Sequence, residues 1–134
     1  MTAFRTYADL YVGARFPEPP ARYAVLADVV AAYRAIGGGT SGQHDHIAPP
    51  TLAAVYIRPA QNALNGPPGG IHAKQKFEFL ASVMVGDTLD TILEVKELFE
   101  RNGRHFVVSE TRTVNQHGVL VCIGLITQVW GREP

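Results

Sequence analysis

The chain has 134 residues, with 12 Lys and Arg against 12 Asp and Glu, and hydrophobic residues make up 46%. This length suits one domain with one core, and the zero net charge argues against binding to nucleic acids or anionic membranes through a basic surface. The single cysteine, Cys122, excludes an intramolecular disulfide and a cysteine-based zinc site. Because no signal-peptide h-region and no apolar run of about 18 residues occurs, we expect a cytoplasmic protein.

The first third of the chain predicts a short strand followed by a helix. Residues 17–20 read Pro-Glu-Pro-Pro, and consecutive prolines are excluded from helix interiors and central strands, so we expect the strand only at residues 21–25. Residues 26–36 carry apolar side chains at helical spacing, and residues 37–39 are three glycines that end the helix.

Residues 51–64 are mostly apolar on every side and predict a second helix that is buried on most of its faces. Pro50 suits the first turn of such a helix, where the missing N–H of proline costs nothing. Pro59 lies inside the pattern and predicts a kink or break near Tyr56.

The second half of the chain alternates between apolar and polar residues and predicts four strands. Asn102-Gly103 is a strong two-residue hairpin signal, and the alternation places Leu89 and Phe99 on the same face of their strand. The predicted strands cover residues 71–79, 88–99, 104–115 and 119–130. The last is apolar on both faces, as in a central strand. An antiparallel sheet needs its apolar face covered, and the helix from residue 51 is the best candidate.

Several short stretches in this order resemble the MaoC-like family, and most closely its FAS1-like dehydratase, or N-terminal MaoC-type, branch. The stretches are residues 47–51, 70–79, 85–89, 106–111 and 115–118. The resemblance implies an α+β hot-dog fold, in which a five-stranded antiparallel sheet wraps around a central helix. It covers nearly the whole chain, so we expect residues 1–134 to form a single hot-dog domain.

The family resemblance also implies an activity. MaoC-like proteins are mostly (R)-specific enoyl-CoA hydratases or 3-hydroxyacyl-thioester dehydratases, and they need no cofactor. The implied ligand is a thioester of coenzyme A or of acyl-carrier protein, and the implied assembly is a homodimer or a heteromer with another hot-dog subunit. The chemistry needs one group that activates water and one that protonates the α-carbon, while a backbone N–H polarises the thioester carbonyl.

The loop that carries catalysis in the family departs from the family pattern in this chain. The family spacing, an aspartate followed five positions later by a histidine, is missing from residues 37–51. His44, Asp45 and His46 are the candidate catalytic residues because they lie in that loop; the alternative is a polar surface loop in which Asp45 caps a turn. A metal site at His44 and His46 is disfavoured because no third ligand is near.

Four further residues are candidates for substrate binding. Pro50 occupies the position of the usual oxyanion-hole glycine and has no N–H to donate, so the Thr51 N–H is expected to replace it. Tyr56 is either core or the wall of an acyl channel. His72 faces either that channel or a subunit interface, or is an ordinary structural histidine.

Three functions remain open from the sequence. The first is a thioester hydratase or dehydratase, and the second is a non-catalytic hot-dog subunit that pairs with a catalytic partner, which the altered loop favours. The third is an acyl-CoA thioesterase. It is weakened because residues 51–64 contain no carboxylate, whereas hot-dog thioesterases usually place one on or near the central helix.

Overall fold

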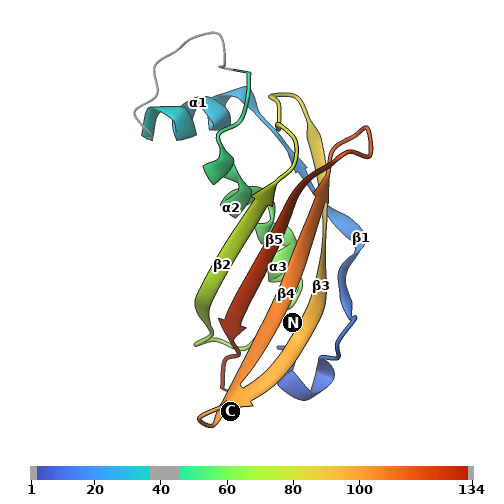
Figure 1. Cartoon of the computed structure of the whole chain (residues 1–134), viewed down its shortest axis with the longest axis vertical. Coiled ribbons are helices and arrows are strands. Elements are labelled where there is room, and N and C mark those ends of the chain that lie inside the picture. The colour runs from blue at the N-terminus through green and yellow to red at the C-terminus, as the bar shows by residue number, and fades with distance from the viewer. Residues whose placement is uncertain (1–2, 37–45, 133–134) are drawn as a thin grey trace.

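The computed structural model describes residues 3–36 and 46–132. Five antiparallel strands form one sheet in the order β1-β3-β4-β5-β2, curved around a short helical segment (Figure 1). The strands are β1 Arg15–Ala24, β2 Ile71–Phe79, β3 Thr88–Arg101, β4 Arg104–Val114 and β5 Leu120–Val129. The last four confirm the predicted strands closely, and β5 lies between two neighbours, as its two apolar faces predicted.

The helix α1 spans Ala27–Ile36, and the central segment consists of three short pieces. These are a 3-10 turn Pro50–Leu52, α2 Ala53–Tyr56 and α3 Arg58–Asn62. The predicted single helix is therefore broken after Tyr56, where the sequence placed the break. The physical reason is Pro59, which lacks the N–H that would bond to residue 55 and whose ring crowds that carbonyl.

The first strand was expected only at residues 21–25, and this predicted start is wrong. β1 begins at Arg15 and includes the prolines. β1 lies at an edge of the sheet, and within residues 3–36 and 46–132 it pairs with β3 alone, with a register shift between Phe16 and Ala21. Proline is tolerated at a sheet edge and at an irregularity, since its missing N–H then removes no ladder bond. From the sequence alone the prolines predict a break, because the sequence does not show that this strand lies at an edge of the sheet.

A second correction concerns Phe99, which lies on the opposite face of the sheet from Leu89. The register between β3 and β4 shifts between Val95 and Glu97, and one extra residue in a strand moves all later side chains to the other face. Phe99 consequently stacks on Phe106, with ring centroids 4.8 Å apart, outside the core.

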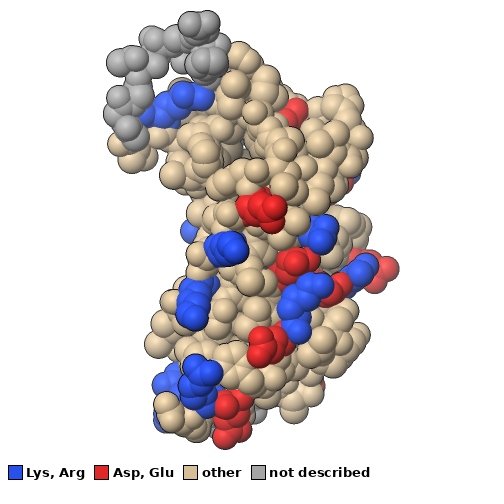
Figure 2. Space-filling model, viewed as in Figure 1, with Lys and Arg blue, Asp and Glu red and all other residues tan. Residues whose placement is uncertain are grey.

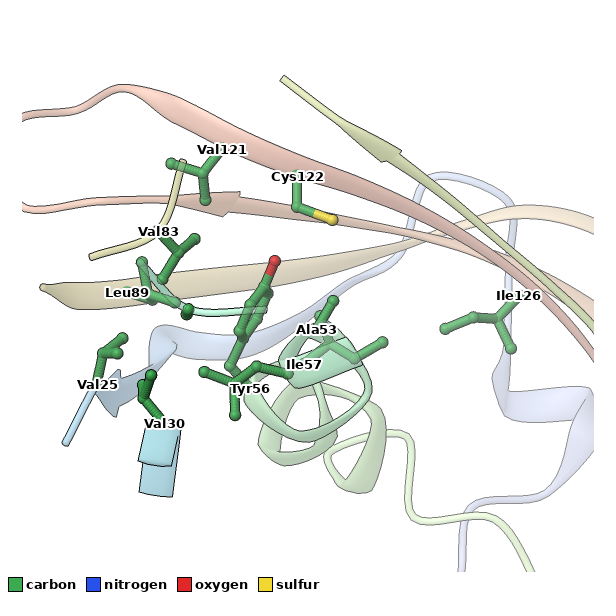
Figure 3. Packing of buried hydrophobic residues seen from close by; sticks show 12 residues of the cluster. Val25, Val30, Ala53, Tyr56, Ile57, Val83, Leu89, Val121, Cys122 and Ile126 are labelled. Carbon is green, nitrogen blue, oxygen red and sulfur yellow. The ribbon is translucent and has the colours of Figure 1, made fainter. Parts of the chain in front are cut away.

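The core lies between the concave face of the sheet and the central segment, in two clusters. The first surrounds α2 and includes Tyr56, Ile57, Leu89, Cys122 and Ile126 (Figure 3). The second surrounds α3 and includes Ala60, Leu64, Leu93, Val107 and Trp130, with Leu10 and Ala14 from the N-terminal segment. Among the helices of residues 3–36 and 46–132, none is long and apolar enough to cross a bilayer.

Candidate functional site

The segment that leads into the central helix is held as a short strand against the connection between β2 and β3. Ile47 and Met84 form an isolated antiparallel bridge. The Ala48 N–H donates to the Val83 carbonyl at 2.7 Å, and the Val85 N–H donates to the His46 carbonyl at 2.8 Å. The guanidinium of Arg34 on α1 also donates to the Ile47 carbonyl. These bonds fix the backbone of residues 46–48, so a side chain there has a defined position relative to the helix.

A pocket of about 360 Å³ lies between this segment and the end of β2. Its lining consists of Ile47, Ala48, Pro49, Pro50, Tyr56, Phe79, Leu80, Ala81, Ser82 and Val83. The volume is at the lower end of the roughly 300–1,000 Å³ typical of ligand pockets. The lining is mostly apolar, so the pocket suits a small apolar group.

Tyr56 contributes a buried aromatic wall to the pocket and is only 3% exposed. Figure 3 shows its ring rising from the central segment toward Cys122 on β5, and its hydroxyl donates a hydrogen bond to that thiol. Burial, and then this bond, raises the pKa of Tyr56, while burial raises the pKa of the Cys122 thiol. Both groups therefore stay protonated and act as packing rather than as acid, base or nucleophile at neutral pH.

The residues predicted to be catalytic lie only partly within the described chain. His44 and Asp45 fall outside the described residues. His46 is exposed and immediately precedes Ile47, the first residue of the pocket lining. Thr51 is also exposed, in the first turn of the central segment, where a backbone N–H has no acceptor within the helix. His46 and Thr51 thus flank the pocket residues Ile47 to Pro50.

His72 lies at the other end of β2 from this pocket. Its Nε2 is 3.3 Å from the Nε2 of Gln61 on α3, and it pairs in register with Gln128 on β5. His72 and Gln128 line a separate, smaller recess of about 320 Å³ at the residues 66–70 connection. Seven residues of strand, roughly 20 Å, separate His72 from Phe79 in the main pocket. Within one chain, His72 and the Pro50 region do not belong to one site.

Sequence reasoning missed a pair of side chains, Asp87 and Gln116, that hold the turn following Val83 of the pocket lining. The buried carboxylate of Asp87 accepts the Met84 N–H at 2.8 Å and the Gln116 side-chain amide at 2.9 Å. The Gln116 side-chain oxygen accepts the Thr88 N–H at 3.0 Å. The turn at residues 84–87 is thereby tied to the turn between β4 and β5. The only sequence signal was an Asp after Gly86, which reads as an ordinary turn.

Replacing Asp87 with alanine is expected to lower the free energy of unfolding by about 1–3 kcal/mol, because two part-buried hydrogen bonds to a charged group are lost. Asp90→Ala is the matched control. Asp90 forms an exposed ion pair with Arg22, and such pairs contribute about 1 kcal/mol or less. Denaturant unfolding followed by circular dichroism measures both variants, and an equal loss in the two would contradict a structural role for Asp87.

Charged side chains that are scattered along the sequence come together on the outer face of the sheet. Figure 2 shows acidic and basic groups alternating across the middle of this face. Glu94 bonds to Arg15 at 2.8 Å and to Lys96 at 2.7 Å, and Glu110 bonds to Arg112 at 2.9 Å. The hydrogen bonds from Lys96 and then Arg15 lower the pKa of Glu94. Since these charges are paired with one another, they form no basic patch for an anionic partner. In the described part of the chain, no group of three or more His, Cys, Asp or Glu is placed to hold a metal.

A five-stranded antiparallel sheet in this strand order, wrapped around a central helical segment with a pocket at the start of that segment, defines a hot-dog protein. The chain belongs to the family described as FAS1-like, dehydratase domain region, which matches residues 30–123. This confirms the MaoC-like assignment made from the sequence.

Solved structures of hydratases and dehydratases are similar to this chain. The R-hydratase PhaJ1 of Pseudomonas aeruginosa is 26% identical, with a TM-score of 0.76, over 95% of this chain and 86% of that one. The MaoC-like dehydratase of Rhodospirillum rubrum is 25% identical, with a TM-score of 0.71, over 95% and 97%. The same fold is found in the HadBC (3R-hydroxyacyl-ACP dehydratase) complex of Mycobacterium tuberculosis. That structure is 21% identical, with a TM-score of 0.73, over 90% of this chain and 96% of that one. No curated protein matches the sequence.

Proposed function

We propose that this protein is a hydro-lyase of the MaoC type, acting as an (R)-specific enoyl-CoA hydratase or 3-hydroxyacyl-thioester dehydratase, or as a subunit of one, in the cytoplasm. The observation that carries the proposal is the pocket at the start of the central segment, with His46 and Thr51 at either side of its lining. The family membership and the 26% identity to an R-hydratase support the same class of reaction.

In the proposed reaction, water adds across the α,β double bond of an acyl thioester. A base takes a proton from water as its oxygen bonds to the β-carbon, and an acid delivers a proton to the α-carbon. His46, with His44 and Asp45, is the proposed acid–base group. The Thr51 N–H would polarise the thioester carbonyl, while Pro50 and Tyr56 bound the acyl group. The thioester is carried by coenzyme A or by acyl-carrier protein.

A second candidate is a non-catalytic hot-dog subunit that shapes the acyl channel of a catalytic partner. The specific observation in its favour is that the sequence of residues 37–51 lacks the family spacing of Asp and His. The fold is also shared with HadBC, whose structure is a complex of two different subunits. A thioesterase is a weaker candidate because residues 50–62 of the central segment carry no carboxylate.

The two leading candidates are separated by assaying the purified chain alone on crotonyl-CoA, following loss of the conjugated thioester absorbance. We expect hydration that falls about 100-fold or more in the His46→Ala variant, because general acid–base groups contribute roughly 10²–10⁴-fold. The matched control is His105→Ala, whose side chain stacks on Tyr7 at the far end of β4 and should leave the rate unchanged. Activity that appears only when a second hot-dog polypeptide is added would establish the non-catalytic subunit instead.

A further inference from the structure

The turn between β2 and β3 is in direct contact with the backbone of His46. The Val85 N–H donates to the His46 carbonyl at 2.8 Å, and Met84 pairs with Ile47 in an antiparallel bridge. The imidazole belongs to an exposed residue, and none of the hydrogen bonds in the described part of the chain involves its ring. The place of that ring is therefore set by the backbone from which it extends, and that backbone rests on the turn.

The turn is held in shape by Asp87. Its Oδ2 accepts the Met84 N–H at 2.8 Å, and its own N–H donates back to the Met84 carbonyl at 3.0 Å. Both main-chain groups of Met84 are available for this, because the bonds of the bridge to Ile47 are made by the residues on either side. The main chain of Gly86 and Asp87 also bonds to Val25 in both directions, at 2.9 Å each. Asp87 is 8% exposed, so water competes weakly for these bonds.

Gln116 ties this turn to the one between β4 and β5. Its side-chain amide donates to Oδ1 of Asp87 at 2.9 Å, and its side-chain oxygen accepts the N–H of Thr88, the first residue of β3, at 3.0 Å. The carboxylate supplies two acceptors, and the amide supplies one donor and one acceptor, so the pair satisfies two backbone N–H groups and itself. Gln116 lies at the surface, so a substitution there changes hydrogen bonds and removes no core packing.

A second connection between the turn and the site runs through α1. Val25, which bonds to the turn, follows β1 directly, and Arg34 in the last turn of α1 donates to the Ile47 carbonyl. Residues 46–48 are therefore bonded to two supports, α1 and the turn at residues 84–87. Because α1 is itself linked to the turn through Val25, the turn is the point at which the two supports meet.

We infer that Asp87 and Gln116 are positioning residues for His46: by tying the turn at residues 84–87 to the sheet, they set the backbone from which the imidazole acts. The role in catalysis rests on the proposed function, whereas the link between the pair and residues 46–48 does not. Neither side chain lines the pocket, so neither is expected to bind the ligand. A displacement of about 1 Å in a reacting group lowers a rate by up to about 10²-fold, so the effect belongs in kcat rather than in KM.

The pair is tested by exchanging its two functional groups. Gln116→Glu removes the donor to Asp87 and sets two carboxylates against each other, so kcat on crotonyl-CoA should fall about ten-fold while KM changes less than about three-fold. Asp87→Asn combined with Gln116→Glu reverses the roles, with an amide at 87 that donates to a carboxylate at 116, and both positions still accept their backbone N–H. The double variant should return to within about three-fold of the wild-type kcat, which also shows that the single variant had folded. An unchanged kcat in Gln116→Glu, or no recovery in the double variant, would overturn the inference.

Two matched controls separate positioning from a general loss of stability. Asp90→Asn removes a carboxylate from β3 that pairs with Arg22 at the surface, and it should leave kcat and KM unchanged. Trp130→Phe weakens the core cluster around α3, at the other end of the sheet, and should leave the kcat of the folded protein unchanged. A kcat that falls as far in Trp130→Phe as in Gln116→Glu would assign the effect to stability and contradict a positioning role.

Hydrogen exchange tests the link to residues 46–48 without any assay of activity. The Ala48 and Val85 amides bond across the bridge, so their exchange, followed by NMR, should become about ten-fold faster in Gln116→Glu and slow again in the double variant. Amides in the middle of β4 should be unaffected, since the change is local. Unchanged exchange at Ala48 and Val85 would overturn the link, and faster exchange with an unchanged kcat would overturn the positioning role. A wild-type chain inactive on crotonyl-CoA would overturn the proposed function, and the exchange rates then decide the link alone.

Discussion

Replacing Trp130 with alanine is expected to lower the free energy of unfolding by about 3–5 kcal/mol. The side chain is 2% exposed and packs in the cluster around α3 with Leu10, Ala60 and Leu64. Its indole N–H donates to the Arg5 carbonyl at 3.2 Å, which ties the N-terminal segment to the end of β5. Truncation removes a large buried surface and leaves a cavity that the surrounding strands cannot fill.

The measurement is guanidinium unfolding followed by circular dichroism, because the variant lacks the single tryptophan of the chain. Trp130→Phe is the matched control. It keeps most of the packing but loses the indole hydrogen bond, so its loss should be well below that of the alanine variant. A loss under about 1 kcal/mol for Trp130→Ala would show that the N-terminal segment does not close over this core.

Tyr56→Ala is expected to have a loss of similar size, about 3–5 kcal/mol, because the ring is central to the cluster around α2. Tyr56→Phe keeps the ring and removes only the hydroxyl that bonds to Cys122, so its loss should be about 1 kcal/mol. Thermal unfolding of the wild type and the two variants separates the contribution of the ring to stability from that of the hydroxyl. Equal losses in the two variants would mean that the hydroxyl, not the ring, holds this part of the core.

The same pair of variants tests the pocket. Tyr56 lines it, so the alanine variant enlarges the space available to an acyl group while the phenylalanine variant leaves its size almost unchanged. Under the proposed function, Tyr56→Ala should shift the preference of the enzyme from four-carbon toward longer acyl thioesters, and Tyr56→Phe should not. The measurement is the ratio of kcat/KM for crotonyl-CoA to kcat/KM for an eight-carbon substrate. If this ratio is the same in Tyr56→Ala and in the wild type, Tyr56 does not contact the acyl group.

Local patterns were sufficient for most of the secondary structure. The alternation of residues 71–79, the Asn102-Gly103 turn and the proline break after Tyr56 each act over a few residues, so the sequence predicted them correctly. The start of β1 and the facing of Phe99 were predicted incorrectly. Both depend on partners distant in sequence, namely an edge position that tolerates proline and a register shift against β4.

The candidate site, like the fold, could be predicted from the sequence only in part. The sequence placed the loop before the central helix at the site, and the structure describes a pocket lined from Ile47 to Pro50 there. It gave no sign that Asp87 and Gln116 together hold the turn next to Val83 of the pocket, since 29 residues separate them in the chain. It also grouped His72 with Pro50, Thr51 and Tyr56, whereas the strand carries His72 to the other end of the sheet.

The sequence by itself determined the last four strands, the broken central helix and, through short motifs, the MaoC-like family, because these depend on side-chain periodicity and backbone chemistry within a few residues. Only the tertiary structure decided which strand lies at an edge, where the pocket closes and which candidate residues share it. Those properties arise from the pairing of strands far apart in the chain, and a shift of one residue in that pairing moves a side chain from one face of the sheet to the other.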